Sequence, residues 1–358
     1  MAIQRNNARN NVKYSRTSFQ KNRSGRKAKK YMNNNSEIFA IIADDLQVVK
    51  ENILAVADKE SDNFHSIEKR LRHVLSTPGK QLRPAITLAC AGLFGNEDKV
   101  NSLKMATGVE LLHIATLIHD DTVDQAKVRR GNATASNLWG NDIAVLLGDY
   151  IFASSAIFVC ETGNIVLVKR FAETIVELSK GELIENLGSY NLKITEEEYF
   201  SKTYLKTASL FKTASFSGSL IGKANREQIS KLTDFGYYFG MGYQIQDDVI
   251  DLVSTESKEG KTISNDVLEG VITLPAITYL KKISKNDEKL AEFSNQQDIS
   301  KQAIEKFQLE ILNSGAIDES LKVANEHFDK AINTLNEIPD NNHKALLIDI
   351  INITRQRI

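Results

Sequence analysis

The stretch that decides the fold reads ELLHIATLIHDDTVDQAKVRRG and covers residues 110–131. Apolar residues at helical spacing lead directly into three carboxylates and two arginines: Asp120, Asp121, Asp124, Arg129 and Arg130. On a helix, residues three and four positions apart are neighbours, so we expect the carboxylates to crowd one face and repel each other. A cation would relieve the repulsion, and Mg²⁺ favours one or two carboxylates together with phosphate oxygens. The arginines would then hold the phosphate groups.

A second cluster of the same kind lies in YQIQDDVIDL, residues 243–252. Asp247, Asp248 and Asp251 repeat the spacing of the first cluster inside another apolar helical pattern. A single charge cluster is usually a solvated helix face. Two clusters with one spacing, both set in apolar sequence, instead indicate a shared metal site.

Composition favours an all-α protein. The 358 residues contain four prolines and no stretch of sustained apolar and polar alternation, so long helices are expected, among them 98–124, 134–160, 195–223 and 226–253. The two cysteines stand alone, which indicates neither a disulfide framework nor a zinc site and fits a reducing compartment. We also expect no apolar run long enough to span a membrane, and hence a soluble, cytoplasmic protein.

The first 30 residues differ sharply from the rest of the chain. They carry ten basic residues and no acidic one, whereas the remainder carries 35 basic and 46 acidic residues. We expect residues 1–35 to be a disordered tail and residues 36–358 to form one domain. The tail could be a solvated segment, an arm for nucleic acid or anionic lipid, an organelle transit peptide, or an extension before a start at Met32. The acidic body offers no matching patch, so no nucleic-acid partner is expected.

Other candidate residues carry little weight alone. Lys80 and Arg83 lie at the entry to a helix in TPGKQLRP, and His113 lies in the apolar run. A lysine and an arginine there are ordinary surface charges unless the fold places them opposite the carboxylates. Thr195 and Glu198 have capping-box spacing, which predicts a helix start.

Together these residues resemble the trans-isoprenyl diphosphate synthases, also called the polyprenyl synthetase family, from about residue 40 onward. The resemblance rests on both aspartate clusters, a GKxxR element, paired arginines, a KT pair, a glutamine before the second cluster and a lysine in the polar connection 254–270. These residues are Asp120, Asp121, Asp124, Asp247, Asp248, Asp251, Gly79, Lys80, Arg83, Arg129, Arg130, Lys206, Thr207, Gln244 and Lys261.

The resemblance implies a single-domain helical bundle around a deep central cavity, with the two aspartate clusters facing each other at its mouth. Three Mg²⁺ ions held by the six aspartates would bind an allylic diphosphate, and a second group of residues would assist: Arg129, Lys206, Thr207, Gln244 and Lys261. Isopentenyl diphosphate would bind opposite, through Lys80, Arg83, His113 and Arg130. The implied reaction is a head-to-tail trans condensation. In it, the aspartates and Lys206 would stabilise the departing diphosphate, and an apolar pocket would protect the carbocation from water.

The resemblance also bears on product length. In the family, the residues four and five positions before the first aspartate lie beneath it on the cavity wall, and here they are Thr116 and Ala115. Both are small, so we expect the cavity to continue past Leu112 and the product to be medium or long, about C30 to C50. Such a chain would serve as a quinone side chain. Phe152 or Phe158 on a neighbouring helix could form the floor.

One departure concerns Val271, which stands where many members have a second lysine in the lid. It could weaken allylic diphosphate binding or mark the large subunit of a two-component synthase. A homodimer or a heteromer with a small subunit is therefore expected, with at most peripheral membrane contact.

Three further functions compete with this interpretation. One is a short-chain farnesyl or geranylgeranyl diphosphate synthase. Another is a class I terpene cyclase, which needs no isopentenyl site and whose second metal motif normally mixes residue types. The last is a regulatory subunit, which the two intact aspartate clusters disfavour.

Overall fold

In the computed structural model, the described residues are 38–76, 79–95, 97–253, 265–283 and 301–358. The tail expected at 1–35 and Lys261 lie outside them. In chain order the elements are η1 (Ala40–Ile42), α2 (Ala43–Asp58), α3 (His65–Leu75), α4 (Leu82–Gly92), α5 (Lys99–Val123), β1 (Val128–Arg129), β2 (Asn132–Ala133), α6 (Ala135–Trp139), α7 (Asn141–Cys160), α8 (Ile165–Leu187), α9 (Glu196–Thr203), the π-helical turn η2 (Tyr204–Ala208), α10 (Ser209–Ile221), α11 (Arg226–Val253), α12 (Asn265–Glu269), α13 (Leu274–Lys282), α15 (Lys301–Asn313), α16 (Ala316–Thr334) and α17 (Asn342–Arg355).

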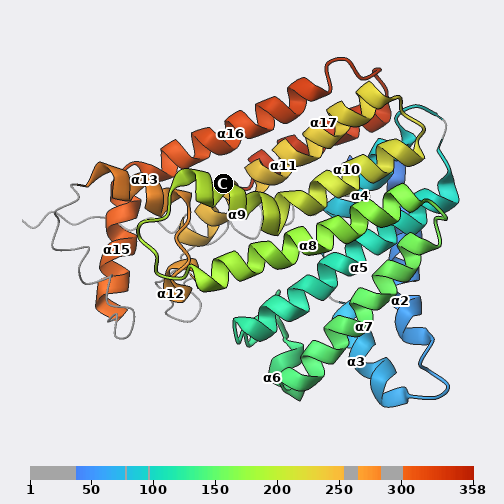
Figure 1. Cartoon of the computed structure of the whole chain (residues 1–358), viewed down its shortest axis with the longest axis horizontal. Coiled ribbons are helices and arrows are strands. Elements are labelled where there is room, and N and C mark those ends of the chain that lie inside the picture. The colour runs from blue at the N-terminus through green and yellow to red at the C-terminus, as the bar shows by residue number, and fades with distance from the viewer. Residues whose placement is uncertain (1–37, 77–78, 96, 254–264, 284–300) are drawn as a thin grey trace, which may run out of the picture. The chain divides into compact units, whose positions relative to one another are not determined.

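The motif helices α5 and α11 lie inside the bundle. Helix α5 packs along α7 and also contacts α4 and α2, while α11 packs between α10 and α16 (Figure 1). A run from Met105 to Leu112 on α5 is buried on every side, as expected of a helix enclosed by neighbours. Apolar burial of this kind stabilises the bundle by roughly 25 cal/mol per Å². The all-α prediction is confirmed.

Two of the predicted helices are interrupted. The helix expected over 134–160 breaks at Gly140, whose φ of 87° lies outside the helical region, and so divides into α6 and α7. The helix expected over 195–223 contains the π turn η2 between α9 and α10. Its predicted start is confirmed: the hydroxyl of Thr195 accepts from Glu198 N, and the Glu198 carboxylate accepts from Thr195 N, which forms a capping box.

The expectation that no helix is apolar enough to span a membrane is wrong for α7. This helix has 20 residues and a window of mean hydropathy 2.0, and it alone among the described helices meets both requirements of length and composition. Helix α7 packs along α5 and α6, yet only 33% of that window is buried within the chain. Its outer face is therefore both apolar and exposed.

Candidate active site

The two aspartate motifs open onto one cavity of about 670 Å³. Its walls come from α4, α5, α7, α8, α9, η2, α11, α12 and the residues after α12. Six aspartates line these walls: Asp120 on α5, Asp124 at its C-terminal end, Asp149 on α7, Asp247 and Asp248 on α11, and Asp266 on α12. The cavity has the size of a typical small-molecule site. Segments more than a hundred residues apart thus converge as the repeated spacing predicts.

The first motif follows the helical period of α5. Leu112, Thr116, Asp120 and Asp124 are four residues apart, and all line the cavity. Asp121 does not share this face, since one residue along a helix turns the side chain by about 100°. It is buried, and its Oδ1 accepts a hydrogen bond from Arg129 Nε at 2.6 Å. The expectation that all three carboxylates crowd one face is therefore wrong for Asp121.

The second motif is held by a hydrogen-bond chain. Tyr199 donates to Asp248 Oδ2 at 2.6 Å, and Gln244 Nε2 donates to Asp248 Oδ1 at 2.7 Å. Thr207 in turn donates to Gln244 Oε1 at 2.6 Å. Asp247 also lines the cavity, whereas Asp251 lies off its walls and accepts from the backbone N–H of Asp266. Spacing alone gave no signal for Tyr199, which approaches from another helix.

Burial makes this group of carboxylates costly to ionise. Desolvation, reinforced by the Glu182 carboxylate, raises the pKa of Asp120 to about 7. Desolvation also raises the pKa of Asp248 to about 7, although Tyr199 and Gln244 donate hydrogen bonds to it. The pKa of Asp124 is raised by the same cause. A cation placed between the motifs would relieve this penalty.

The donor set fits a hard divalent cation, because carboxylate oxygens are the ligands that Mg²⁺ and Ca²⁺ prefer. Within the part of the chain that the structure describes, no three His, Cys, Asp or Glu side chains converge closely enough to hold a metal by themselves. Phosphate oxygens or waters would have to complete the coordination. This is how Mg²⁺ is usually held beside a phosphorylated substrate.

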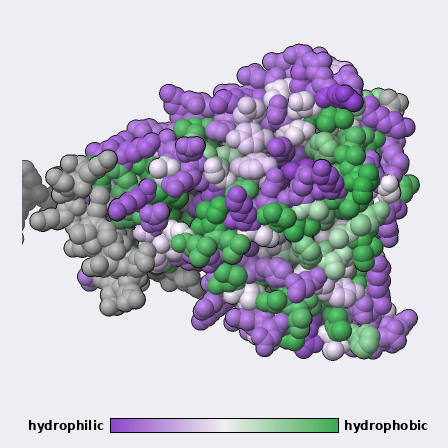
Figure 2. All heavy atoms as spheres, in the orientation of Figure 1, coloured by the Kyte–Doolittle hydropathy of each residue, from purple (hydrophilic) through white to green (hydrophobic). Residues whose placement is uncertain are grey.

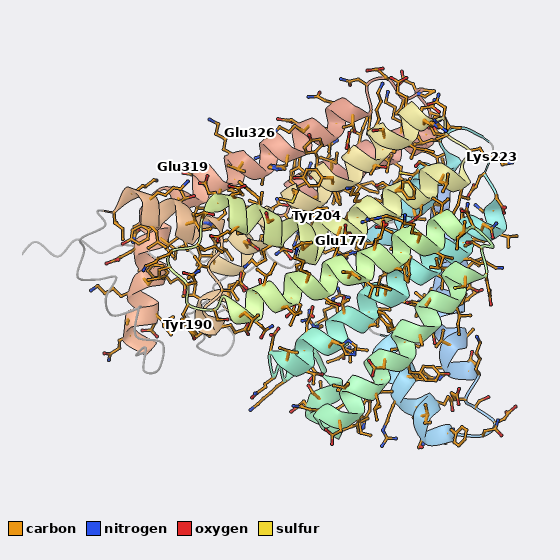
Figure 3. The ribbon with its side chains drawn as sticks, in the orientation of Figure 1. Glu177, Tyr190, Tyr204, Lys223, Glu319 and Glu326 are labelled. Carbon is orange, nitrogen blue, oxygen red and sulfur yellow. The ribbon has the colours of Figure 1, made fainter. Side chains whose placement is uncertain are left out.

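Lys206 lies on the π turn η2, a kind of local distortion often found at functional sites. Burial opposes its charge, but the carboxylates of Glu185, Glu182 and Asp120 outweigh this effect and raise its pKa. The turn packs closely against α8 at Gly181. A Cβ atom added to this glycine would lie 2.6 Å from the backbone nitrogen of Lys206. Outside the cavity, Tyr204 donates to Glu177 Oε1 at 2.7 Å, which ties the turn to α8 (Figure 3).

A basic group adjoins the second motif. Arg83, His113 and Arg130 line the cavity, and the Arg83 guanidinium lies 4.3 Å from the centre of the Phe211 ring. The buried Nε of Arg83 has no acceptor among the described residues, so an anion would satisfy it. Burial and the nearby arginines hold the pKa of His113 well below its ordinary value, which favours the neutral ring.

Lys80 lies off the cavity walls but close to the same group. Partial burial, Arg357 and Arg130 lower the pKa of its ammonium. Arg357 lies two positions beyond the end of α17 and forms an ion pair with Asp247. It also lies 4.9 Å from the centre of the Tyr243 ring. Sequence reasoning assigned Arg357 no role, because its contact with the second motif spans 110 residues.

The apolar end of the cavity lies between α5, α7 and α8. Its lining residues there are Leu112, Thr116, Leu117, Phe152, Ile175, Leu178 and Leu183. Phe152 lines the cavity and Phe158 does not. Of the two phenylalanines expected to close the far end of the cavity, only Phe152 is therefore in place to do so. Ala115 is fully buried and lies off the cavity walls, so its expected place beside Thr116 is wrong. Val271 does line the cavity.

Comparisons with known proteins agree with this geometry. The sequence model described as Polyprenyl synthetase matches residues 65–311. Heptaprenyl diphosphate synthase component 2 of Geobacillus stearothermophilus is 31% identical, over 87% of this chain and 96% of the relative.

Two solved structures have the same fold. The first is a decaprenyl diphosphate synthase from Rhodobacter capsulatus, with a TM-score of 0.83 and 30% identity over 90% of this chain and 99% of that one. The second is a polyprenyl synthase from Caulobacter crescentus CB15, solved with calcium and isoprenyl diphosphate. It has a TM-score of 0.81 and 27% identity over 90% of this chain and 98% of that one. Family model, relatives and fold agree: the chain belongs to the polyprenyl synthetase family and is a trans-prenyltransferase.

Proposed function

We propose that the protein is a Mg²⁺-dependent synthase that condenses an allylic diphosphate with isopentenyl diphosphate and makes a medium or long polyprenyl diphosphate. One observation carries the proposal: carboxylates of both motifs and an apolar pocket share a single cavity. A diphosphate at the carboxylate end would direct its prenyl chain toward Thr116 and Phe152. This arrangement suits ionisation at one end and protection of a carbocation at the other.

In this proposal, Asp120, Asp124, Asp247 and Asp248 would hold Mg²⁺, whose positive charge would stabilise the departing diphosphate. Gln244 and Tyr199 hold both oxygens of Asp248 in place. Asp121 contributes through Arg129, whose guanidinium it orients. Asp251, which accepts a hydrogen bond from the backbone N–H of Asp266, would complete the second motif beside Asp248.

Lys206 and Arg129 would bind the allylic diphosphate, since both side chains line the carboxylate end of the cavity. Isopentenyl diphosphate would occupy the basic side, where Arg83 offers an N–H without an acceptor. His113, being neutral, would donate a single hydrogen bond rather than a charge. The two charged head groups would thus bind on opposite sides of the reacting carbons.

The active form in this proposal is a homodimer that buries the outer faces of α7 and α8. The exposed apolar residues of these helices that do not line the cavity are Val145, Leu146, Ile157, Ile165, Val166, Val176, Ile184 and Leu187. Figure 2 shows apolar side chains gathered over α7 and α8 on the side in view. A patch of this extent usually marks a protein interface. A small partner subunit is the alternative occupant.

The experiment is an incubation of the protein with Mg²⁺, farnesyl diphosphate and labelled isopentenyl diphosphate, with the products separated after dephosphorylation. We expect a ladder that ends between about C30 and C50. A product that stops at C20 would contradict the proposed length but not the reaction. Binding of farnesyl diphosphate without any product would point to a missing partner subunit, and a polyprenyl quinone of normal length in a knockout would contradict the quinone role.

A further inference from the structure

Lys202 is a buried lysine in the cavity to which the reaction as described assigns no role. It lies near the end of α9, is 6% exposed, and lines the cavity that holds both aspartate motifs. Lysine is almost never buried unless its charge is compensated. The burial of Lys202 therefore needs a compensating partner or a function.

The ammonium of Lys202 lies in the charged part of the cavity. Lys202 Nζ is 3.0 Å from Glu185 Oε2, and Lys206 Nζ pairs with the other oxygen of the same carboxylate. The two lysines are four positions apart on a helix that continues from α9 into η2, so both face α8. One carboxylate thus gathers two ammonium groups, and one of these already faces the proposed diphosphate site.

Lys202 also faces the second motif. Tyr199, three positions before Lys202 on α9, donates a hydrogen bond to Asp248 Oδ2, and all three residues line the cavity. The ammonium is therefore paired with Glu185 on α8, and Lys202 lies about one helical turn from the residue that contacts Asp248 on α11. A metal-bound diphosphate held by the second motif would lie within the reach of such a group.

Among the residues that the structure describes, acidic side chains outnumber basic ones in this part of the cavity. The acidic residues here are Asp120, Asp124, Asp247, Asp248, Asp266, Glu182 and Glu185, while the basic residues nearby are Lys202, Lys206, Arg129 and Arg357. Position 271, where the family resemblance leads us to expect a lysine, holds valine, and Val271 lines the same cavity. Loss of that positive charge would leave an allylic diphosphate with one cationic ligand fewer.

We propose that Lys202 is a further ligand of the allylic diphosphate and supplies the positive charge that Val271 does not. An ammonium group has three donors, so Lys202 can keep its bond to Glu185 and donate another to a phosphate oxygen. Glu185 then positions Lys202 and Lys206 together. This inference rests on the proposed function, because it needs a diphosphate in the cavity.

The test is binding of farnesyl thiodiphosphate, a slowly reacting analogue, in the presence of Mg²⁺. We expect Lys202→Met to raise its Kd about tenfold, the range of a charge-assisted hydrogen bond, and to leave the KM for isopentenyl diphosphate unchanged. The double variant Lys202→Met/Val271→Lys should recover most of the affinity. Lys322→Met, which removes an exposed lysine on α16, is the matched control and should bind as the wild type does.

An unchanged Kd in Lys202→Met would overturn the inference. So would equal losses of affinity for both substrates together with a lower melting temperature, because these would indicate a purely structural lysine. A double variant no better than Lys202→Met would show that Lys202 does not replace a lysine at 271. If the wild type itself failed to bind the analogue with Mg²⁺, the proposed function would fall along with the inference.

Discussion

At the scale of single residues, helical phase decides which side chains reach the cavity. Asp120, Thr116 and Leu112 line it because they are four residues apart, whereas Asp121 and Ala115 are turned away. The sequence allowed the positions of the motifs to be predicted, but not this division within each motif. The packing of α5 against its neighbours selects the face that opens to the cavity.

Substitutions at Thr116 and Ala115 test directly which side of α5 faces the cavity. Thr116→Phe should shorten the product, because the ring would enter the cavity above Leu112. Ala115→Phe should instead overpack the core, lower stability by about 1–3 kcal/mol and leave the length of any product unchanged. Product chromatography and denaturant unfolding on both variants separate the two outcomes. Shorter products from Ala115→Phe in a fully stable protein would contradict the assignment.

Asp120 should weaken the metal-free fold at alkaline pH. Its pKa rises from 3.8 to about 7 on folding, so the native state binds the proton more tightly and stability falls as pH increases through this window. In EDTA, Asp120→Asn should therefore be more stable than the wild type at pH 8, by on the order of 2 kcal/mol, and no more stable at pH 4. Urea unfolding at both pH values measures this. An equal gain at both pH values would refute the electrostatic cause.

At the scale of elements, the π turn η2 determines where Lys206 lies. The predicted continuous helix missed it, since a π turn depends on contacts that are remote in sequence. Those contacts are the close approach of α8 at Gly181 and the bond between Tyr204 and Glu177 (Figure 3). The break at Gly140 was missed because its signal in the sequence is weak: a single glycine does not by itself end a helix.

Gly181→Ala should displace η2, because its Cβ would come within 2.6 Å of the Lys206 backbone. We expect stability to fall by about 1–3 kcal/mol and turnover by at least tenfold. Glu326→Ala, on the exposed side of α16, should change neither. Steady-state kinetics and thermal unfolding on this pair check the claim. Turnover of Gly181→Ala equal to that of the control would show that η2 tolerates the shift.

At the scale of the whole molecule, the sequence indicated the fold class and the convergence of the two motifs, because both follow from repeated local patterns. It did not indicate Tyr199, Lys202 or Arg357, which belong to no motif and reach the cavity only through tertiary packing. Nor did it indicate the exposed apolar face of α7.

The proposed dimer is testable on that face. Leu146→Lys combined with Val176→Lys places two charges on residues that are 63% and 67% exposed in the single chain. We expect the dimer to dissociate, since charges buried at an interface without partners are costly. Val100→Lys, at an equally exposed valine on the first turn of α5, should leave the dimer intact. Sedimentation velocity distinguishes the two, and a dimer that persists in the double variant would rule out this interface.

The central claim is that the aspartates of both motifs act together on one metal-bound diphosphate. The measurement that tests it most directly is the rate of prenyl transfer as a function of Mg²⁺ concentration for the wild type, Asp120→Asn and Asp247→Asn. We predict that EDTA abolishes the wild-type rate and that each variant loses at least a hundredfold in turnover while remaining folded. Full activity in EDTA, or a wild-type rate in either variant, would contradict the account.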